Sequence, residues 1–355
     1  MIALSDVPGL VFRLLTSSLI NCTNTSINDV PHSKEFFHSL REHPFYLIAV
    51  CLCFVLCACT ITIGFIHILF ITYYTSESER RFFMFYLAST APMVSLFSLI
   101  AMCMPRVWLL CHLLAFLVFS IGLWIVICLL MHIFQGHNSL VSRMSERLQH
   151  IELATPPFCC CCVFPCLPKV SLQGKRIRIC EWMVLQTPFV RLIATFAALV
   201  IYFEYQEDSG MYLKILDIIT LPSLLAGIYG MHILVTTVSR LDEVISYRYV
   251  VIFRLLDLFF MVFGLQQPVF DLVARSGMLG CGSILPAVET SCFWRNACTI
   301  IESFVVTLIS TVLMQPSKPS FFDKHPSCRT LDSARNSNYE MALENHSVTT
   351  SSTLA

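Results

Sequence analysis

Charged residues are scarce in this chain. Only 13% of its 355 residues are Asp, Glu, Lys or Arg, while 56% are hydrophobic. Soluble domains carry about 25% charged residues and do not expose this much apolar surface to water. Lipid must therefore be the solvent for most of the chain. The charges also balance, with 23 acidic and 23 basic residues, so no positive excess points to a nucleic-acid partner.

Catalytic and targeting signatures are absent as well. The sequence has no HExxH pair, GxSxG elbow, Walker loop or dinucleotide fingerprint, so we expect neither an enzyme nor a bound cofactor. It lacks a basic segment at its start, and Asp6 and Arg13 interrupt the apolar stretch that follows, which argues against a cleavable signal peptide. No internal repeat is evident, unlike in many secondary transporters.

Long apolar stretches are abundant. A helix needs about 20 mostly apolar residues to cross a membrane, and helices satisfy their own backbone hydrogen bonds in lipid. The second and third stretches are separated by Pro105 and Arg106. We predict an all-α integral membrane protein, a bundle of seven transmembrane helices. Their expected ranges are 46–74, 82–104, 107–134, 181–203, 212–238, 249–272 and 292–314.

The distribution of Lys and Arg orients the bundle, because short cytoplasmic loops are rich in them. With an extracellular N-terminus and a cytoplasmic C-terminus, the outside connections between the spans hold only Arg106 and Arg275, with Arg295 at a border. The cytoplasmic segments then hold Arg80, Arg81, Arg143, Arg147, Lys169, Lys175, Arg176, Arg178, Arg240, Arg248, Lys318, Lys324, Arg329 and Arg335.

This topology divides the chain into segments. Residues 1–45 form an extracellular tail, in which Asn21 and Asn24 lie in glycosylation sequons. Residues 46–314 form the seven-span domain, with a cysteine-rich cytoplasmic loop at 135–180. Residues 315–355 are expected to be a disordered cytoplasmic tail, because they are polar and have few apolar residues.

A run of cysteines marks the cytoplasmic loop. Adjacent cysteines are poorly spaced for zinc, and the cytosol is reducing, so neither a metal site nor a disulfide is favoured there. Flanking apolar and basic residues are typical of S-acylation, which would hold the loop at the inner leaflet. The predicted acylation sites are Cys159, Cys160, Cys161, Cys162 and Cys166.

The last outer loop contains a second cysteine feature. Cys281 and Cys292 lie close together in sequence on the oxidising side of the membrane. A disulfide between them is our prediction, with Cys22 and Cys298 as competing partners.

Polar residues inside the spans are candidates for a transport path, since ionisable groups at membrane depth are costly. In the sixth span, spacings of three and four place polar residues on one helical face, and Arg254 and Asp257 are spaced to pair. Alternatively, Arg254 and Asp271 only mark the span's ends. In the fifth span, a face of small residues from Thr220 to Gly230 predicts close helix packing. The candidate path residues are Arg254, Asp257, Gln266, Gln267, Asp271 and Glu302.

Three stretches carry a resemblance to a known family. Residues 80–108 combine a basic pair, an apolar run and a closing Pro-Arg. Residues 156–168 are the polycysteine run, and residues 265–309 contain a Gln-Pro motif, a cysteine-bearing loop and the glutamate of the last span. Together they resemble the organic solute transporter alpha-subunit family, over roughly residues 45–315.

This resemblance implies a plasma-membrane subunit with an outer N-terminus. Family members carry amphipathic steroid-like solutes down their gradient without ATP, and they pair with a small single-span beta subunit. We therefore expect a facilitative transporter subunit that moves steroid conjugates and bile-acid-like anions. Its partners would be membrane lipid and a beta-type subunit or a second copy of the chain.

Two other classes share parts of this pattern. A seven-span receptor would have the same topology, but no DRY-like triplet closes the third span and no NPxxY closes the seventh. A non-transporting membrane scaffold or trafficking protein, held by the acylated loop, would bind a solute without flux.

Overall fold

The described part of the chain consists almost entirely of helices. In the computed structural model, it covers residues 30–147, 150–151, 170–171, 174–205, 209–238, 249–275 and 284–314. Within these ranges, seven helices are at least 26 residues long. They are α3 (Pro44–Tyr74), α4 (Ser78–Cys103), α5 (Trp108–Ile133), α7 (Gly174–Tyr205), α8 (Ser209–Val238), α10 (Tyr249–Arg275) and α11 (Ala287–Leu313).

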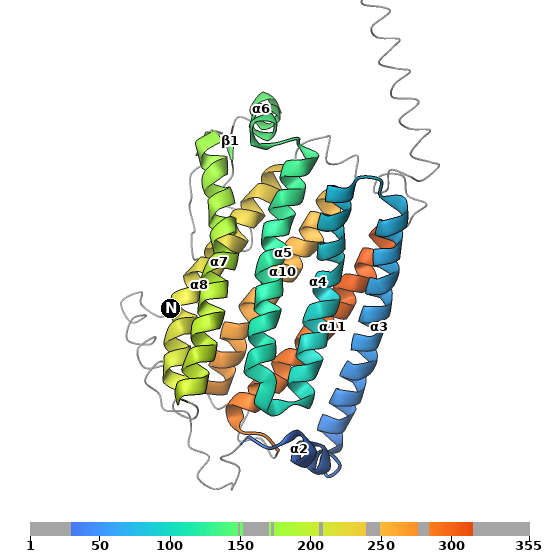
Figure 1. Cartoon of the computed structure of the whole chain (residues 1–355), viewed down its shortest axis with the longest axis vertical. Coiled ribbons are helices and arrows are strands. Elements are labelled where there is room, and N and C mark those ends of the chain that lie inside the picture. The colour runs from blue at the N-terminus through green and yellow to red at the C-terminus, as the bar shows by residue number, and fades with distance from the viewer. Residues whose placement is uncertain are drawn as a thin grey trace, which may run out of the picture.

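Shorter elements cover the two ends of this bundle. At one end lie α2 (Ser33–Leu40) and the 3₁₀ turn η2 (Pro105–Val107); at the other lie α6 (His137–Arg147) and a two-residue antiparallel pair, β1 (His150–Ile151) with β2 (Val170–Ser171). We call these the α2 end and the α6 end (Figure 1). Pro105 begins η2 directly after the end of α4, because proline disfavours the continuation of a helix.

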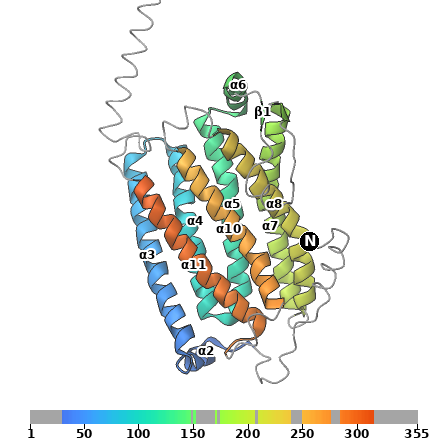
Figure 2. The ribbon, with the colours of Figure 1, turned by 180° about the vertical axis from the view of Figure 1, so that it is seen from behind.

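The long helices form two layers. In Figure 1, α3, α4, α5 and α7 stand side by side in the nearer layer, and Figure 2 shows α11, α10 and α8 lying across them. Helix α11 packs on both α3 and α4, and α8 packs on α7. The first long helix, α3, begins at the α2 end, and the last one, α11, finishes at the α6 end. This part of the chain therefore starts and ends on opposite sides of the bundle.

Six of these described helices are long and apolar enough to cross a membrane: α3, α4, α5 (together with η2), α7, α8 and α11. The fold is thus that of a helical integral membrane protein. The fourth helix starts at Gly174 rather than at 181. Its first turns carry Lys175, Arg176 and Arg178, whose long side chains reach water while the backbone stays helical.

The outer surface of the bundle is apolar. Phe54 and Phe65 on α3 and Phe189, Phe196 and Phe203 on α7 each expose more than half of their side-chain surface. A lipid environment satisfies such a surface, whereas water would not. Inside, the main core is built where the two layers meet, and Phe119 and Phe260 are fully buried in it.

The face of small residues on α8 predicted close packing against another helix. The structure confirms this prediction and shows that the partner is α7. A side chain on Gly230 would meet the backbone carbonyl of Cys180 at 2.9 Å, and one on Gly227 would collide with Thr187. Only glycine lets the two backbones approach this closely. The small-residue stripe of α8 is therefore a packing surface.

Candidate functional site

A hydrogen-bonded network of polar side chains joins α10 to α11. Gln266 donates from its Nε2 to Glu302 Oε1, and Thr299 Oγ1 donates to Gln266 Oε1 at 3.0 Å. The other carboxylate oxygen of Glu302 is buried and has no hydrogen-bond partner among the described residues. A buried oxygen left without a donor is costly, and polar groups of this kind inside a membrane usually have a functional reason.

A second polar cluster joins α8 to α10. His232 Nδ1 contacts Asp257 Oδ2, and Asp257 is only 5% exposed. Arg254 donates from Nη1 to the hydroxyl of Thr236 at 3.0 Å. The remaining Asp257 oxygen, Oδ1, is buried without a partner in the described part of the chain.

The structure gives Asp257 a partner that the sequence did not predict. Its carboxylate contacts His232 of the facing helix α8. Packing decides this outcome, because α10 turns Asp257 toward α8, where a polar partner is available at the same depth.

The two clusters lie on different sides of α10. Nine residues separate Asp257 from Gln266, which corresponds to two and a half helical turns and a rise of about 13.5 Å. Accordingly, Asp257 faces α8 and Gln266 faces α11. The four predicted path residues whose side chains are described are therefore brought into two groups within the bundle, and α10 connects these groups.

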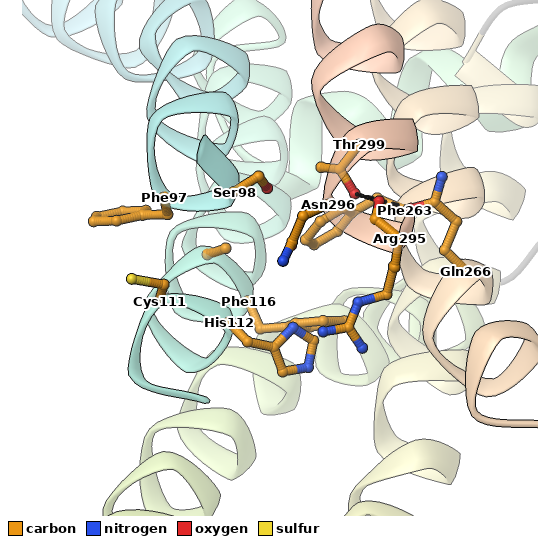
Figure 3. A pocket seen from close by; sticks show the side chains of 11 residues that line it. Phe97, Ser98, Cys111, His112, Phe116, Phe263, Gln266, Arg295, Asn296 and Thr299 are labelled. Atoms are coloured by element: carbon orange, nitrogen blue, oxygen red, sulfur yellow. Dashed lines mark hydrogen bonds between the residues drawn. The ribbon is translucent and has the colours of Figure 1, made fainter. Parts of the chain in front are cut away.

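An internal cavity opens beside the α10–α11 network (Figure 3). Its volume is about 10 Å³, room for roughly one water molecule. Side chains from α4, α5, α10 and α11 surround it. They are Phe97, Ser98, Cys111, His112, Ala115, Phe116, Phe263, Gln266, Arg295, Asn296 and Thr299.

The sequence-based prediction missed Arg295 as part of this site, since it lay at a span border. In the structure Arg295 is 5% exposed, in the third turn of α11. A signal was present, because Arg295, Thr299 and Glu302 follow the i, i+4, i+7 spacing of one helical face. That face points toward α10 and the cavity (Figure 3).

A second arginine lies close to the same cavity. The Arg191 guanidinium of α7 is 4.5 Å from the centre of the Phe116 ring, which lines the cavity. Arg191 also interacts electrostatically with Asp217 of α8. An aromatic ring and a carboxylate both stabilise a buried guanidinium, so Arg191 has its partners within the bundle.

A wider cleft lies at the α6 end, between the end of α5 and the start of α4. Its volume is about 690 Å³, and its lining includes Glu77, Glu79, Arg80 and His132. His132 Nε2 is 3.1 Å from a Glu77 carboxylate oxygen. The cleft has the size of a small-molecule site.

Several predicted sites lie outside the described residues and stay predictions. The side chains of Gln267 and Asp271 are not among those described, although both residues belong to α10. Cys292 is described and lies buried in α11, but Cys281 is not. No group of three or more His, Cys, Asp or Glu residues in the described ranges could hold a metal ion. The remaining undescribed sites are Asn21, Asn24, Cys159, Cys160, Cys161, Cys162 and Cys166.

Comparison with known proteins decides the family. Residues 47–319 match the sequence profile of the family described as "Organic solute transporter Ostalpha". The chain belongs to this family. It is 62% identical to organic solute transporter alpha-like protein 2 of Caenorhabditis elegans, over 91% of this chain and 93% of that protein. The resemblance found from the sequence motifs is thus confirmed.

More distant relatives carry related names. Organic solute transporter alpha-like protein 3 of Caenorhabditis elegans is 29% identical over 88% of each chain. Organic solute transporter subunit alpha of Leucoraja erinaceus is 22% identical, over 63% of this chain and 64% of its own length. No solved structure matches the chain. Membership in the Ostalpha family supports the role of a multi-pass membrane transporter subunit.

Proposed function

We propose that this chain is the solute-carrying subunit of a facilitative transporter for amphipathic organic solutes, with steroid conjugates and bile-acid-like anions as its substrates. The main support is the Gln266–Thr299–Glu302 network, a set of polar groups inside a bundle whose outer surface is apolar. An amphipathic solute needs an apolar wall with a few well-placed polar contacts. The phenylalanine-rich interior of the bundle has that composition.

The path we propose runs along α10. Asp257 and Arg254 would contact the solute on the α8 side, and Gln266 and Glu302 on the α11 side. Gln267 and Asp271 would extend the same path toward the α2 end. The unpartnered oxygens of Asp257 and Glu302 support this assignment, because each is a hydrogen-bond acceptor that the described residues leave unused.

For the topology, we propose that α10 also crosses the membrane, as the sixth of seven spans. At about 1.5 Å per residue its 27 residues extend about 40 Å, enough to cross the hydrocarbon layer. The α2 end would face the outside and the α6 end the cytosol of a cell bounded by the plasma membrane. The basic side chains of Lys175, Arg176 and Arg178 at the α6 end support this orientation.

Covalent modification and assembly are further parts of the proposal. The cysteine run of residues 159–166 would be acylated, and Asn21 and Asn24 glycosylated. Cys281 and Cys292 would form a disulfide on the outer side of the membrane. The partner would be a small single-span beta-type subunit, or a second copy of the chain. The name of the Leucoraja relative, a subunit alpha, supports a complex of more than one kind of chain.

The test is uptake of a radiolabelled steroid conjugate into cells that express the chain alone or with single-span partners. We expect saturable flux that persists after ATP depletion. Glu302→Gln should lower this flux about tenfold at equal surface level, because it removes a charge-assisted hydrogen bond.

Ser310→Ala is the matched control on the same helix. The Ser310 hydroxyl donates to the backbone oxygen of Val306, within α11, so this variant should transport normally. If surface expression is confirmed and no pairing produces flux, the transporter proposal is wrong. If Glu302→Gln transports like the control, the α10–α11 network is not on the path.

A further inference from the structure

Arg295 is a buried cation without a counter-charge among the described residues. It is 5% exposed, and its one described side-chain hydrogen bond is a weak one, from Nη2 to the Cys292 sulfur at 3.8 Å. No Asp or Glu whose side chain is described forms an ion pair with it. Arg191, in contrast, has the Phe116 ring and the charge of Asp217. A guanidinium carries five N–H donors, and most of those on Arg295 are unused.

The position of Arg295 makes the missing counter-charge costly. Eight residues separate it from the start of α11, so it lies about 12 Å along that helix from the α2 end. At such depth a charged side chain must pair or reach water. Its guanidinium extends into the cavity between α5 and α10, close to His112 and Phe116 (Figure 3).

Asn296 is a second unused polar group in the same cavity. It is 6% exposed, and no hydrogen bond of its side-chain amide is found in the described part of the molecule. In Figure 3 the amide points into the space between α11 and the α4–α5 pair. Two buried donors from adjacent residues therefore share one small cavity. Among the described residues, Arg295 has only the weak Cys292 acceptor, and none is found for the Asn296 amide.

The cavity has room for one atom of an anionic group, such as one oxygen of a carboxylate or sulfate. Its volume of about 10 Å³ is enough for roughly one water molecule and far less than a whole steroid needs. Arg with a neighbouring amide is the donor set that binds carboxylate, sulfate or sulfonate oxygens. The rings of Phe97, Phe116 and Phe263 line the same space and could contact the apolar body next to such a group.

We infer that Arg295 and Asn296 form an anion-binding site that holds the acidic head of the solute. The inference rests on the proposed function for the identity of the ligand, but not for the existence of the site. A free inorganic anion presents the same chemistry to these donors, and binding measurements separate the two sources.

The first experiment measures binding to the purified full-length protein, with its partner subunit if one is needed for expression. The readout is the shift in thermal unfolding temperature as ligand is titrated. The probes are a steroid sulfate, a neutral steroid glycoside of similar size, and sodium chloride against sodium gluconate. Arg295→Gln should weaken steroid sulfate binding about 10- to 100-fold and leave glycoside binding unchanged.

Three further variants sharpen this result. Arg295→Lys keeps the charge and should restore most of the affinity, and Asn296→Ala should weaken it about five- to tenfold. Arg106→Gln is the matched control, because it removes an arginine at the α2 end that hydrogen-bonds to Val30 and His32 instead of facing the cavity. The control should bind like the wild type. If Arg295→Gln does not fold, the Lys and Asn296 variants still decide the question.

Each outcome has one meaning. Chloride stabilisation that Arg295→Gln abolishes, without any effect of steroid sulfate, supports the site and assigns it to a free ion. Equal losses for sulfate and glycoside, or unchanged sulfate affinity in Arg295→Gln, overturn the inference. If the wild type binds steroid sulfate through Arg295 but transports nothing, the anion site stands and the transporter proposal fails. If transport is normal and independent of Arg295, only the anion site fails.

Discussion

Replacing His232 by leucine should destabilise the protein strongly. The imidazole of His232 is the hydrogen-bond partner of Asp257 Oδ2 in the described structure, and Oδ1 has none. His232→Leu therefore leaves a 5% exposed carboxylate with both oxygens unpaired. Breaking a buried pair from one side costs about 3–5 kcal/mol. We expect about 3 kcal/mol, because helices in lipid or detergent recover part of the loss by finding other partners.

The double variant isolates the cause of this loss. His232→Leu combined with Asp257→Leu removes both polar groups, so most of the penalty should disappear, leaving about 1 kcal/mol. The control is His67→Leu. His67 is 2% exposed and bonds through Nε2 to the neutral Thr311 hydroxyl at 2.9 Å. Its loss should cost only about 0.6–1.7 kcal/mol, as for neutral pairs in membranes.

Denaturant titration of the purified proteins in one detergent measures the free energy of unfolding of each. Five proteins are compared: the wild type, the single variants His232→Leu, Asp257→Leu and His67→Leu, and the double variant. The coupling energy of the cycle should be at least about 2 kcal/mol. The reasoning is refuted if His232→Leu costs no more than His67→Leu and the double variant recovers nothing. That result would mean that the Asp257 carboxylate is stabilised by something other than His232.

Three other predictions concern packing and modification. Gly230→Leu should cost about 3 kcal/mol and lower surface expression, because a Cβ atom there meets the Cys180 carbonyl at 2.9 Å. Unfolding of the purified variant measures this cost. Replacing Asn21 and Asn24 by Gln should remove the glycosidase-sensitive shift on gels, and a remaining shift would place glycans elsewhere. Labelling with a clickable palmitate analogue should vanish when Ser replaces each cysteine of the cytoplasmic-loop run. Retained labelling would contradict the assignment of these cysteines as acylation sites. The replaced residues are Cys159, Cys160, Cys161, Cys162 and Cys166.

Much of the architecture was predictable because it depends on local properties of the chain. Whether about 20 consecutive residues are apolar is readable from those residues alone, and the helices that satisfy this condition are present. The small residues of α8 likewise indicated a tight helix contact before its partner, α7, was known. The start of α7 at Gly174 was missed because basic residues in its first turns made it resemble a loop.

The candidate site depended on information that no local pattern contains. Periodicity showed that Asp257 and Glu302 lie on particular faces of their own helices, but not which neighbouring helix each face meets. The partners of Asp257 and Gln266 are 25 and 36 residues away in sequence, His232 and Glu302. For the same reason Arg295 seemed to mark a span border. Composition thus determined the membrane and the helices, and sequence motifs indicated the family. Helix packing alone decided which polar groups meet and which buried arginine is left without a counter-charge among the described residues.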